Sequence, residues 1–590
     1  MEKLKVLLTK PPSSDLDQFD KNQNKIRAYD LYPPISLTTI AASVLKKVSN
    51  VEIEILDLDF EILKYFRENA KSPLSTRDVM KRLIIDKMEQ FPPDLCGIGV
   101  MFSTAHENTL KIANIVKQKT PNIKIICGGN HATFACKRIL EECPSIDFIF
   151  LYEADNSFPS FLEYMKGNIT FKELKGIAWL DKSKNEVKLT AYDSLIHELD
   201  PLPIPAWNLV PIREYQEHGR MASIHRYGNH NAPSYVMQTV RGCVASCSFC
   251  SVRSFYGKGV RAYSAKRVLE EIDYLYNDLG IKQLEILDDD FSFDRKRTLE
   301  ICNALIKRNY DLEWNMTNGI RLGTINEEVM HAMIGAKCRA ISIGIESGND
   351  TTLARVRKPL SIKMLYRKNE IFKKYPELYV MGNYMVGFPF ENDEQMMNTY
   401  KVAEDIALDW SKFSVFHPLP GTPEFQSLDE ESKETYDFST IKYNMSFDDA
   451  KNYKTEIEKQ MSNSLMHEEK KDNYISQSNK KISQLAYIKN LEINFIRNKN
   501  LRGENVDRAI KDYEGILKFI VEDHAIAHYC LTKAYSYKGQ NKMAKKHANK
   551  IFEIFANPSK KIWIEYFDKL ISKDEMNKLK ILSTNANIQA

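Results

Sequence analysis

The sequence predicts an α/β protein built in three successive parts: a doubly wound parallel sheet, a parallel barrel or partial barrel, and an all-helical C-terminal region. Three observations carry this prediction. Short apolar segments alternate with amphipathic, helix-like segments over about the first 165 residues. The same alternation resumes near residue 234 in six steps of similar length. Beyond about residue 430, strand-like segments stop.

Composition is consistent with this organisation and excludes several classes of protein. The chain has 590 residues, enough for about four domains. Hydrophobic residues make up 43% and charged residues 27%, which are proportions of globular proteins and not of disordered chains or fibres. Lys and Arg exceed Asp and Glu by only 4 (83 against 79), so the net charge does not indicate nucleic acid or an anionic membrane as a partner. With no signal-peptide pattern and no long apolar stretch, we expect a soluble cytoplasmic protein.

The first predicted domain covers residues 1–170. Strand-like segments that are apolar on both faces are typical of a parallel sheet covered by helices. Such sheets bind ligands at the carboxyl ends of their strands. The expected strands are 3–8, 51–58, 94–102, 123–129 and 147–151, and the expected helices are 35–47, a charged stretch that ends near Gln90, 106–118 and 156–165.

Residues 171–230 interrupt the alternation. The segment 176–190 has the pattern of a hairpin, with a polar turn between two alternating runs. It is followed by the Pro-rich segment 197–212. Because proline fixes its own φ and restricts the residue before it, we expect a stiff connector between domains.

The second predicted domain, residues 231–430, is the barrel. Barrels of this kind place their active sites at the carboxyl ends of the strands. The expected strands are 234–240, 282–288, 311–317, 339–345, 379–386 and 411–416, and the expected helices are about 264–279, 294–308, 325–336, 361–374 and 392–408.

The last part, residues 431–590, is predicted to be helical. Residues 427–490 are charged and mostly helical in pattern. Residues 503–555 have the Ala and aromatic spacing of a tetratricopeptide-like unit. One or two such units are too few for a solenoid, so we expect this region to pack on the catalytic body or on its substrate.

Three of the ten cysteines lie within eight residues: Cys243, Cys247 and Cys250. They follow the first barrel strand, and no fourth cysteine or local histidine completes the four-ligand shell that a structural zinc normally has. Three thiolates on one loop can hold three irons of a [4Fe–4S] cluster and leave the fourth iron open. The alternative, three unremarkable loop cysteines, fits this spacing poorly.

This segment resembles the signature of the radical S-adenosylmethionine (SAM) enzymes, C-x3-C-x-Φ-C with an aromatic Φ, which here is Phe249. The resemblance implies that the open iron chelates the amino and carboxyl groups of SAM. The reduced cluster then cleaves SAM to methionine and a 5'-deoxyadenosyl radical. It also implies a partial (βα)6 barrel, which agrees with the six steps above.

Later strand ends resemble the same family. Two are matched to segments that contact SAM: Gly344, Glu346 and Ser347 in one, Gly387 and Pro389 in the other. Candidate catalytic residues are Asp290, Glu346 and His417, although a packed or solvated role for His417 is the stronger alternative. For the adjacent carboxylates 288–290, a helix cap or loop is weighed against direct contact with substrate or SAM. Residues Asn315, Thr317 and Arg321 are further polar candidates.

The N-terminal domain, together with the downstream cysteines, resembles that of the cobalamin-binding radical SAM enzymes. The segments that carry this resemblance are 32–46, 99–109, 127–134 and the Pro-rich connector, while dinucleotide and phosphate-loop motifs are missing. The D-x-H-x-x-G motif that supplies a lower-face histidine to cobalt is not present either, and acidic character in the 151–158 segment is reduced to Glu153 and Asp155. The resemblance gives as candidate cobalamin contacts Ser103, Thr104, Gly128, Gly129, His131 and Glu153, with His131 not expected to ligate cobalt.

The leading functional hypothesis is cobalamin-dependent radical SAM methylation of an unactivated carbon, with the methyl group carried by methylcobalamin. One alternative keeps the radical chemistry but gives rearrangement, cyclisation or oxidation without methyl transfer. Another is a non-enzymatic iron–sulfur sensor or partner platform. We expect a [4Fe–4S] cluster, SAM and cobalamin as cofactors, a flavodoxin or ferredoxin as electron donor, and an anaerobic cytoplasm. The substrate, a small molecule or a peptide, is not defined by the sequence, and neither nucleic acid nor membrane is expected as a partner.

Overall fold

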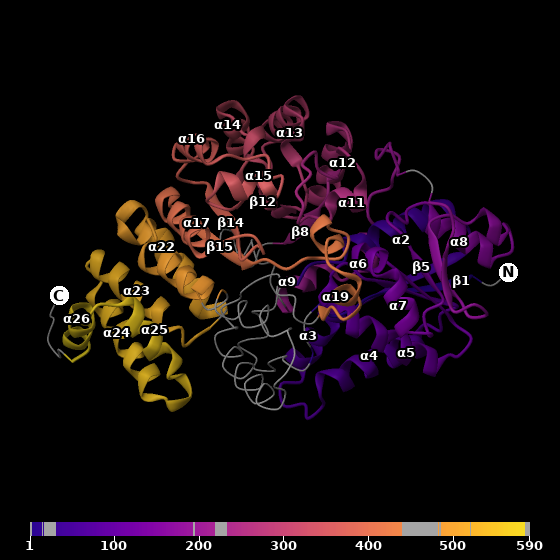
Figure 1. Cartoon of the computed structure of the whole chain (residues 1–590), viewed down its shortest axis with the longest axis horizontal. Helices are drawn as coiled ribbons and strands as arrows, with labels where there is room; N and C mark the ends of the chain where they lie inside the picture. The colour runs from indigo at the N-terminus through magenta and orange to yellow at the C-terminus, as the bar shows by residue number, and fades with distance from the viewer. Residues whose placement is uncertain are drawn as a thin grey trace.

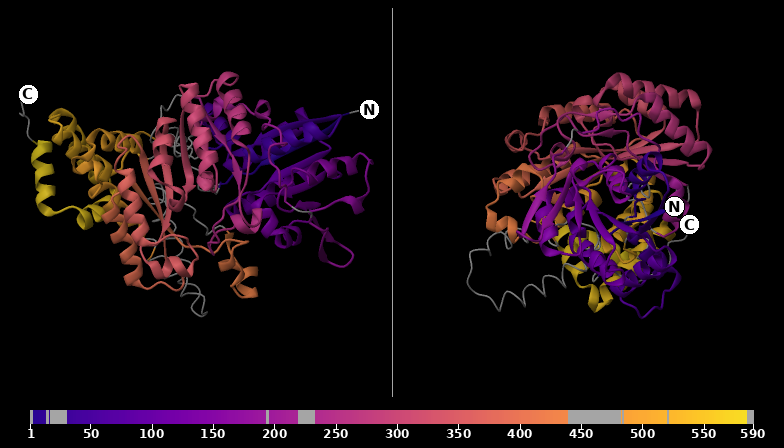
Figure 2. Two further views of the ribbon diagram at one scale, coloured as in Figure 1. Left: turned by 90° about the horizontal axis from the view of Figure 1, so that it is seen from above. Right: turned by 90° about the vertical axis from the view of Figure 1, so that its right-hand side faces the viewer.

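The computed structural model describes residues 3–13, 16, 31–192, 195–218, 233–438, 482, 485–519 and 521–584. These residues form the three predicted parts in series (Figure 1). The N-terminal α/β domain and the C-terminal helices lie at opposite ends of the molecule, with the barrel domain between them, and the views in Figure 2 agree with this arrangement.

The first domain is a doubly wound sheet, as predicted. Its order is β2-β1-β3-β4-β5-β6-β7, and the first five strands are parallel. The hairpin β6–β7 pairs antiparallel with β5, so it extends this sheet and is not a separate part of the connector. The strands are β1 (Leu4–Lys10), β2 (Val51–Asp57), β3 (Leu95–Gly99), β4 (Lys124–Gly128), β5 (Phe148–Phe150), β6 (Ile177–Asp181) and β7 (Glu186–Leu189).

The helices of this domain depart from prediction in two places. The charged stretch before Gln90 is two helices, because Ser75 and Asp78 form a capping box that starts a new helix. Residues that follow β4 also form two short helices instead of a loop. The helices are α2 (Ile35–Lys47), α3 (Leu58–Glu68), α4 (Thr76–Gln90), α5 (His106–Lys119), α6 (Asn130–Phe134), α7 (Cys136–Glu142) and α8 (Ser157–Met165).

The second domain contains six parallel strands in the order β15-β14-β13-β12-β11-β8, which confirms the predicted partial barrel. A two-stranded ribbon, β9 (Val240–Arg241) with β10 (Arg261–Ala262), brackets the cysteine segment. The strands are β8 (Ser234–Met237), β11 (Gln283–Ile286), β12 (Glu313–Ile320), β13 (Cys338–Glu346), β14 (Tyr379–Val386) and β15 (Trp410–Val415). The helices are α11 (Val252–Tyr256), α12 (Ala265–Asn277), α13 (Arg295–Arg308), α14 (Glu327–Gly335), α15 (Asp350–Arg355), α16 (Ile362–Phe372), α17 (Asp393–Ile406), α18 (Pro423–Gln426) and α19 (Glu430–Glu434).

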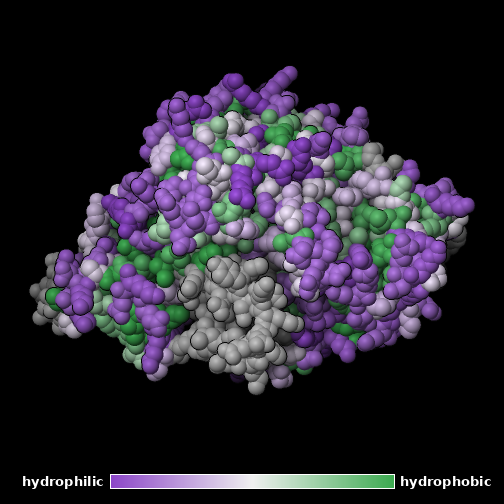
Figure 3. Space-filling model, viewed as in Figure 1, coloured by the Kyte–Doolittle hydropathy of each residue, from purple (hydrophilic) through white to green (hydrophobic). Residues whose placement is uncertain are grey.

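The C-terminal region packs on the barrel at β14 and β15. One hydrophobic core contains Tyr379 and Trp410 of the barrel together with Phe495 and Tyr513 of the tail. The tetratricopeptide-like segment forms three successive antiparallel helices, α22 (Val506–Phe519), α23 (Ala525–Tyr537) and α24 (Asn541–Ala556), followed by α25 (Ile562–Leu570) and α26 (Lys573–Thr584). On the face in Figure 3, hydrophobic side chains gather over these helices, whereas hydrophilic ones prevail on the outer helices of the barrel.

None of the helices in the described part of the chain has both the length and the apolar character that a membrane crossing requires.

Candidate active site

The carboxyl ends of the two parallel sheets face each other. The side chain of Asn130, which follows β4, donates a hydrogen bond to Ser251 of the cysteine segment (3.3 Å). Beside it, the ring of Phe134 packs edge-on against Phe255, with their centroids 6.4 Å apart. Gly421, after β15, also lies directly against Phe134. Because ligands of parallel sheets bind at carboxyl ends, the two expected binding edges adjoin in one site.

The cysteine segment is anchored at its base by Asp288, at the end of β11. This carboxylate is completely buried and accepts hydrogen bonds from the backbone N–H of Thr239 (2.5 Å), the backbone N–H of Val240 (3.1 Å) and the Thr239 hydroxyl. Arg297 donates to the carbonyl and hydroxyl of Thr239 from the other side. The helix cap that we considered for the acidic triplet is provided instead by Asp294, which accepts from the Arg297 N–H.

The third carboxylate of the triplet reaches the cysteines. Asp290 is fully buried, accepts a hydrogen bond from Arg321 Nε (2.7 Å), and lies 3.9 Å from the sulfur of Cys243. Burial, together with the charge of neighbouring Asp288, raises the pKa of Asp289 to about 7. The structure therefore places two predicted polar residues, Asp290 and Arg321, next to the cysteine loop.

The three cysteines carry free, partly buried thiols. Burial raises the pKa of Cys243 to about 11 and that of Cys250 to about 12, so these thiols stay protonated until they ligate a metal. Among the described residues no three His, Cys, Asp or Glu side chains are grouped closely enough for a single ion. Three thiols on one loop suit a four-iron cluster, in which each cysteine ligates a different iron.

One of the strand-end segments matched to SAM contacts carries a charged pair, Glu346 with Lys358. Glu346 has a left-handed backbone (φ 67°), a conformation that is costly for a non-glycine residue and often marks functional sites. Its carboxylate accepts a hydrogen bond from Lys358 Nζ at 2.8 Å. A Cβ on Gly344 would lie 2.6 Å from the Glu346 carboxylate and 2.7 Å from Lys358 Nζ, so a larger residue there would displace the ends of this pair.

Lys358 was not recognised in the sequence. Burial opposes its charge, but attraction to Glu346, and then to Cys247, raises the pKa of Lys358 above its usual value. The lysine is therefore a fixed cation beside the cysteine loop. Such a group suits the carboxylate of SAM. Its only sequence signal is the short basic run 355–358.

The aromatic residue of the signature packs away from the thiols. The ring of Phe249 lies 6.2 Å from that of Phe388, in a small apolar cluster with Val356 and Phe416. This cluster supports the backbone on which the cysteines are carried.

The second segment matched to SAM contacts is a turn after β14. Glu391 accepts hydrogen bonds from the backbone N–H groups of Gly387 (3.0 Å) and Phe388 (3.2 Å), and Pro389 is exposed. Ser347 is buried and contacts Glu391 and Thr399, so it orders the strand end from behind.

Three further candidates lie on the barrel strands or just beyond them. Asn315 on β12 is buried, and its side-chain oxygen has no hydrogen-bond partner among the described residues. Thr317 on the same strand is half-buried. His417, two residues after β15, is half-buried as well and has interactions of its own.

On the cobalamin-matched side, His131 belongs to a buried chain of hydrogen bonds. Its Nδ1 lies 2.8 Å from the Ser103 hydroxyl, its Nε2 lies 2.9 Å from His106 Nδ1, and His106 Nε2 lies 2.8 Å from Glu142. Burial lowers the pKa of His131 to about 3, so its ring is neutral. Both of its ring nitrogens have hydrogen-bond partners in this arrangement. Half-buried Thr104 adjoins Ser103.

The sheet edge next to this chain of hydrogen bonds allows a ligand to approach the backbone closely. Gly129 has φ 111°, and a Cβ there would lie 2.6 Å from the Val100 carbonyl oxygen, so this turn requires glycine. Gly128 precedes it at the end of β4. Met101 and Phe102, after β3, are large hydrophobic residues that are about half exposed (46% and 48%). An apolar surface at the ligand-binding edge fits the face of a corrin.

Glu153, the remaining candidate cobalamin contact, forms ion pairs with two arginines. It is buried and binds Arg241 (2.9 Å) and Arg261 (2.8 Å), and Asp155 binds Arg241 beside it. The structure thus brings Glu153 to the base of the cysteine loop. Sequence inspection missed both arginines.

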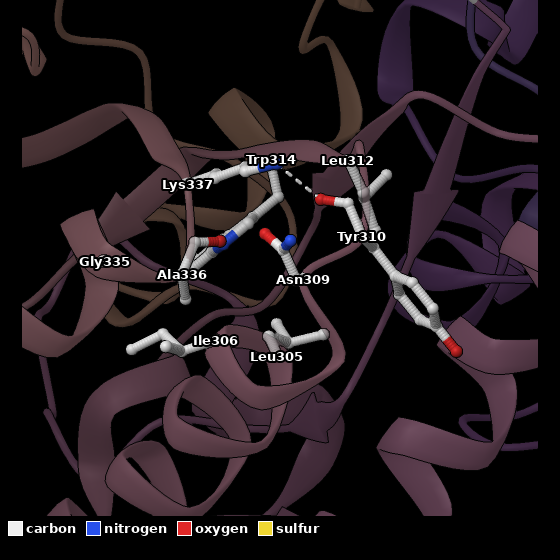
Figure 4. Close-up of a pocket in the computed structure, with 9 residues that line it drawn as sticks. All are labelled: Leu305, Ile306, Asn309, Tyr310, Leu312, Trp314, Gly335, Ala336 and Lys337. Carbon is white, nitrogen blue, oxygen red and sulfur yellow. Dashed lines mark hydrogen bonds between the residues drawn. The ribbon is translucent and has the colours of Figure 1, made fainter.

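A separate small cavity lies away from this site. It has a volume of about 90 Å³ and adjoins the amino end of β12, where Trp314 donates a hydrogen bond to the Ala336 carbonyl. Figure 4 shows the residues that line it: Leu305, Ile306, Asn309, Tyr310, Leu312, Trp314, Gly335, Ala336 and Lys337. Because barrel active sites occupy the opposite ends of the strands, we assign it no catalytic role.

Comparisons with known proteins agree with this geometry. Residues 237–403 match the model of the radical SAM superfamily, and residues 25–162 match that of the B12 binding domain. The chain is 30% identical over 426 residues to the cytidylyl-2-hydroxyethylphosphonate methyltransferase of Streptomyces wedmorensis, a match that covers 66% of this chain and 76% of that protein. It is 29% identical over 423 residues to an uncharacterized methyltransferase of Pyrococcus horikoshii, with 72% and 82% covered.

One solved structure resembles the chain over almost its entire length. It is the cobalamin-dependent SAM radical enzyme OxsB with aqua-cobalamin and SAM bound. The TM-score is 0.57 at 15% identity, and the match covers 98% of this chain and 84% of that one. At this identity the likeness shows the fold alone, including the helical C-terminal region.

Proposed function

Because the chain belongs to the family of radical SAM enzymes that carry a cobalamin-binding domain, we propose that it methylates an unactivated carbon of its substrate. The observation that carries this proposal is the meeting of two cofactor edges: the cysteine loop and the B12-binding sheet adjoin through Asn130 and Ser251. Two relatives named as methyltransferases support the same reaction.

The chemistry requires both cofactors. When bound, the reduced cluster supplies the electron that cleaves SAM, and the corrinoid supplies the methyl group. An sp3 carbon has no proton acidic enough for ordinary base catalysis, so a radical is needed to activate it.

The chain's own residues hold and orient these groups. Cys243, Cys247 and Cys250 would ligate three irons and leave the fourth open to SAM. The Lys358 ammonium, held by Glu346, would face the carboxylate of SAM. Asp290 and Arg321 would order the loop on the side of Cys243.

The edge of the N-terminal sheet would hold the corrinoid. Gly129 permits close approach of the backbone, and Met101 and Phe102 offer an apolar surface. His131 and Ser103 would support this edge through their buried hydrogen bond. The substrate, a small molecule or a peptide, would enter between the two edges.

We also infer that an acidic electron donor, a flavodoxin or ferredoxin, reduces the cluster. The backbone N–H of Ser248, inside the cysteine motif, donates to the Val356 carbonyl (3.0 Å). The exposed residues Arg355 and Arg357 flank this contact, so positive charge lies close to the cluster loop. Since a reduced open cluster reacts with oxygen, we place the enzyme in an anaerobic cytoplasm.

The test needs no knowledge of the substrate. Protein is purified without oxygen, reconstituted with iron and sulfide, loaded with hydroxocobalamin, desalted, and incubated with SAM and reductant. We expect nearly one corrinoid per chain and release of S-adenosylhomocysteine, the by-product of methyl donation. The triple variant Cys243→Ala, Cys247→Ala, Cys250→Ala should retain the corrinoid but form no 5'-deoxyadenosine. If the wild-type protein forms 5'-deoxyadenosine and no S-adenosylhomocysteine, rearrangement, cyclisation or oxidation replaces methylation as the function.

A further inference from the structure

Four charged side chains join the B12-binding domain to the base of the cysteine loop, and we refer to them as the interdomain clamp. They are Glu153 and Asp155, which follow β5, and Arg241 and Arg261, which stand on β9 and β10. Two positive and two negative charges balance. Arg241, Glu153 and Asp155 are no more than 9% exposed.

The two arginines lie at the beginning and at the end of the cysteine loop. Arg241 and Arg261 are directly paired in the two-stranded ribbon, and the loop that contains all three cysteines runs between them. Arg241 stands two residues before Cys243. A shift of the clamp therefore moves the whole loop relative to the N-terminal domain.

The hydrogen bonds of the clamp define the orientation of its side chains, and the charges of these side chains balance. The two terminal nitrogens of Arg241 each bind one oxygen of Asp155, both at 3.0 Å, and one of them also binds Glu153 at 2.9 Å. Arg261 binds both oxygens of Glu153, at 3.0 and 2.8 Å, and the Ile196 carbonyl at 2.6 Å. Bidentate arginine–carboxylate pairs hold a defined orientation that a lysine cannot reproduce.

The barrel holds the same backbone from the opposite side. Asp288 accepts from the N–H groups of Thr239 and Val240, the two residues before Arg241. The loop base is thus fastened to the barrel by Asp288 and to the B12-binding domain by Asp155, within three successive residues. Buried ion pairs contribute little net stability, so a role in positioning better accounts for this arrangement.

From these contacts we propose that the interdomain clamp is a set of positioning residues that fixes the place of the iron–sulfur cluster relative to the corrinoid. The inference rests on the proposed function, because only a two-cofactor reaction requires this registry. The abstracted hydrogen and the incoming methyl group must both be within reach of one carbon. Displacement by about 1 Å can cost on the order of 100-fold in rate.

The experiment measures the position of the cluster relative to the cobalt of the corrinoid. Anaerobic holoprotein is prepared with cob(II)alamin and the reduced cluster, and pulsed EPR records the cobalt-to-cluster distance distribution. The test variants are Arg241→Lys and Asp155→Asn, which keep size and remove the bidentate pair. The matched control is Arg267→Lys, because Arg267 forms an equally buried ion pair with Glu271 (2.9 Å) within a single helix.

We expect both clamp variants to retain iron and corrinoid at wild-type levels but to give a broadened or displaced distance distribution. They should also form more 5'-deoxyadenosine per S-adenosylhomocysteine released than wild type does. The control should match wild type in both measurements. If Arg241→Lys does not fold, Arg261→Met, which removes only the outer pair, provides the same comparison.

Two results would overturn the proposal. One is a clamp variant with the wild-type distance distribution. The other is loss of the cluster with retention of the corrinoid, which would make the clamp a requirement for folding of the loop instead of registry. Failure of the proposed function is distinguishable from both, because wild-type protein would then bind no corrinoid or release no S-adenosylhomocysteine.

Discussion

Asp288 gives the sharpest test of how the cysteine loop is built. Replacement by Leu keeps approximately the same volume but removes the acceptor for the N–H groups of Thr239 and Val240. An unsatisfied buried donor costs about 1–3 kcal/mol, so two of them cost about 2–6 kcal/mol. Replacement by Asn keeps one oxygen for these donors and loses mainly the charge assistance, which predicts a smaller cost of about 1–2 kcal/mol.

The assay is hydrogen exchange of the peptide that spans residues 239–256, together with iron retained per chain after anaerobic reconstitution. We expect the free energy of local opening to fall in the order wild type, Asp288→Asn, Asp288→Leu, and iron retention to fall in the same order. Asp294→Asn is the control, because Asp294 caps α13 and Asn caps equally well. Wild-type exchange in Asp288→Leu would refute the reasoning that this carboxylate anchors the loop.

Three further predictions concern other parts of the molecule. Burial lowers the pKa of His524 to about 3 and that of His528 to about 4, so protonation of either histidine disfavours the folded tail. The stability of the tail that is present above about pH 6.5 should therefore be lost as the pH falls, by about 2 kcal/mol per histidine at pH 5. Faster hydrogen exchange in α23 would show this loss. Asn494→Ala should destabilise the tail–barrel contact by about 2–6 kcal/mol, because it leaves the buried N–H and C=O of Ser411 unpaired, measured by exchange in β15. Lys358→Met should weaken SAM binding to the reconstituted protein about 10- to 100-fold, since a charge-assisted hydrogen bond contributes about 1.5–3 kcal/mol.

Each of these predictions has an internal comparison. Helix α16 contains no histidine, so its exchange, corrected for the intrinsic rate, should not change at pH 5. Asn494→Asp keeps an acceptor for the Ser411 N–H and should fall between wild type and Asn494→Ala. Lys363→Met, on an exposed position of α16, should bind SAM as wild type does. Equal SAM affinity in Lys358→Met, unchanged α23 exchange at pH 5, or an unaffected β15 in Asn494→Ala would contradict the corresponding argument.

The alternation of apolar segments was sufficient to predict the parallel strands of both sheets, but not the short ribbon β9–β10. β14 has the predicted limits, 379–386, because it is a mostly apolar run that ends before the Gly387-Phe388-Pro389 turn. The cysteine segment could equally be recognised as a candidate cluster site, since its three thiols lie within eight residues. Local signals of this kind do not depend on how the chain folds at long range.

Contacts between distant residues were not predictable from such signals. Glu153 was expected to contact cobalamin, but the structure ties it to Arg241 and Arg261, about 90 and 110 residues further along the chain. Lys358 was missed because the short basic run 355–358 has no specific pattern, and its importance comes only from the ion pair it forms with Glu346. The two helices after β4 were missed because a Gly-Gly start indicates a turn.

The C-terminal helices cover the sheet edge at β15 that the six-stranded partial barrel leaves unpaired. In the described chain β15 pairs with a strand on one side only, and an unpaired sheet edge is prone to association with other chains. Asn494 covers this edge with a side-chain amide that imitates a peptide group: its oxygen accepts from the Ser411 N–H (2.7 Å) and its nitrogen donates to the Ser411 carbonyl (2.6 Å).

A buried carboxylate also binds the tail to this edge of the sheet. Asp409, just before β15, accepts hydrogen bonds from Arg508 (3.0 Å) and Asn500 (3.1 Å) of the tail and from the Val380 N–H of the barrel (2.9 Å). These contacts fasten residues 494–508 of the tail to the amino end of β15, whereas Ile482 lies against Gly387 at the turn after β14. Because the amino end of β15 is opposite to the carboxyl ends that meet at Asn130 and Ser251, we expect Asn494→Ala to loosen the tail without displacing the cysteine loop.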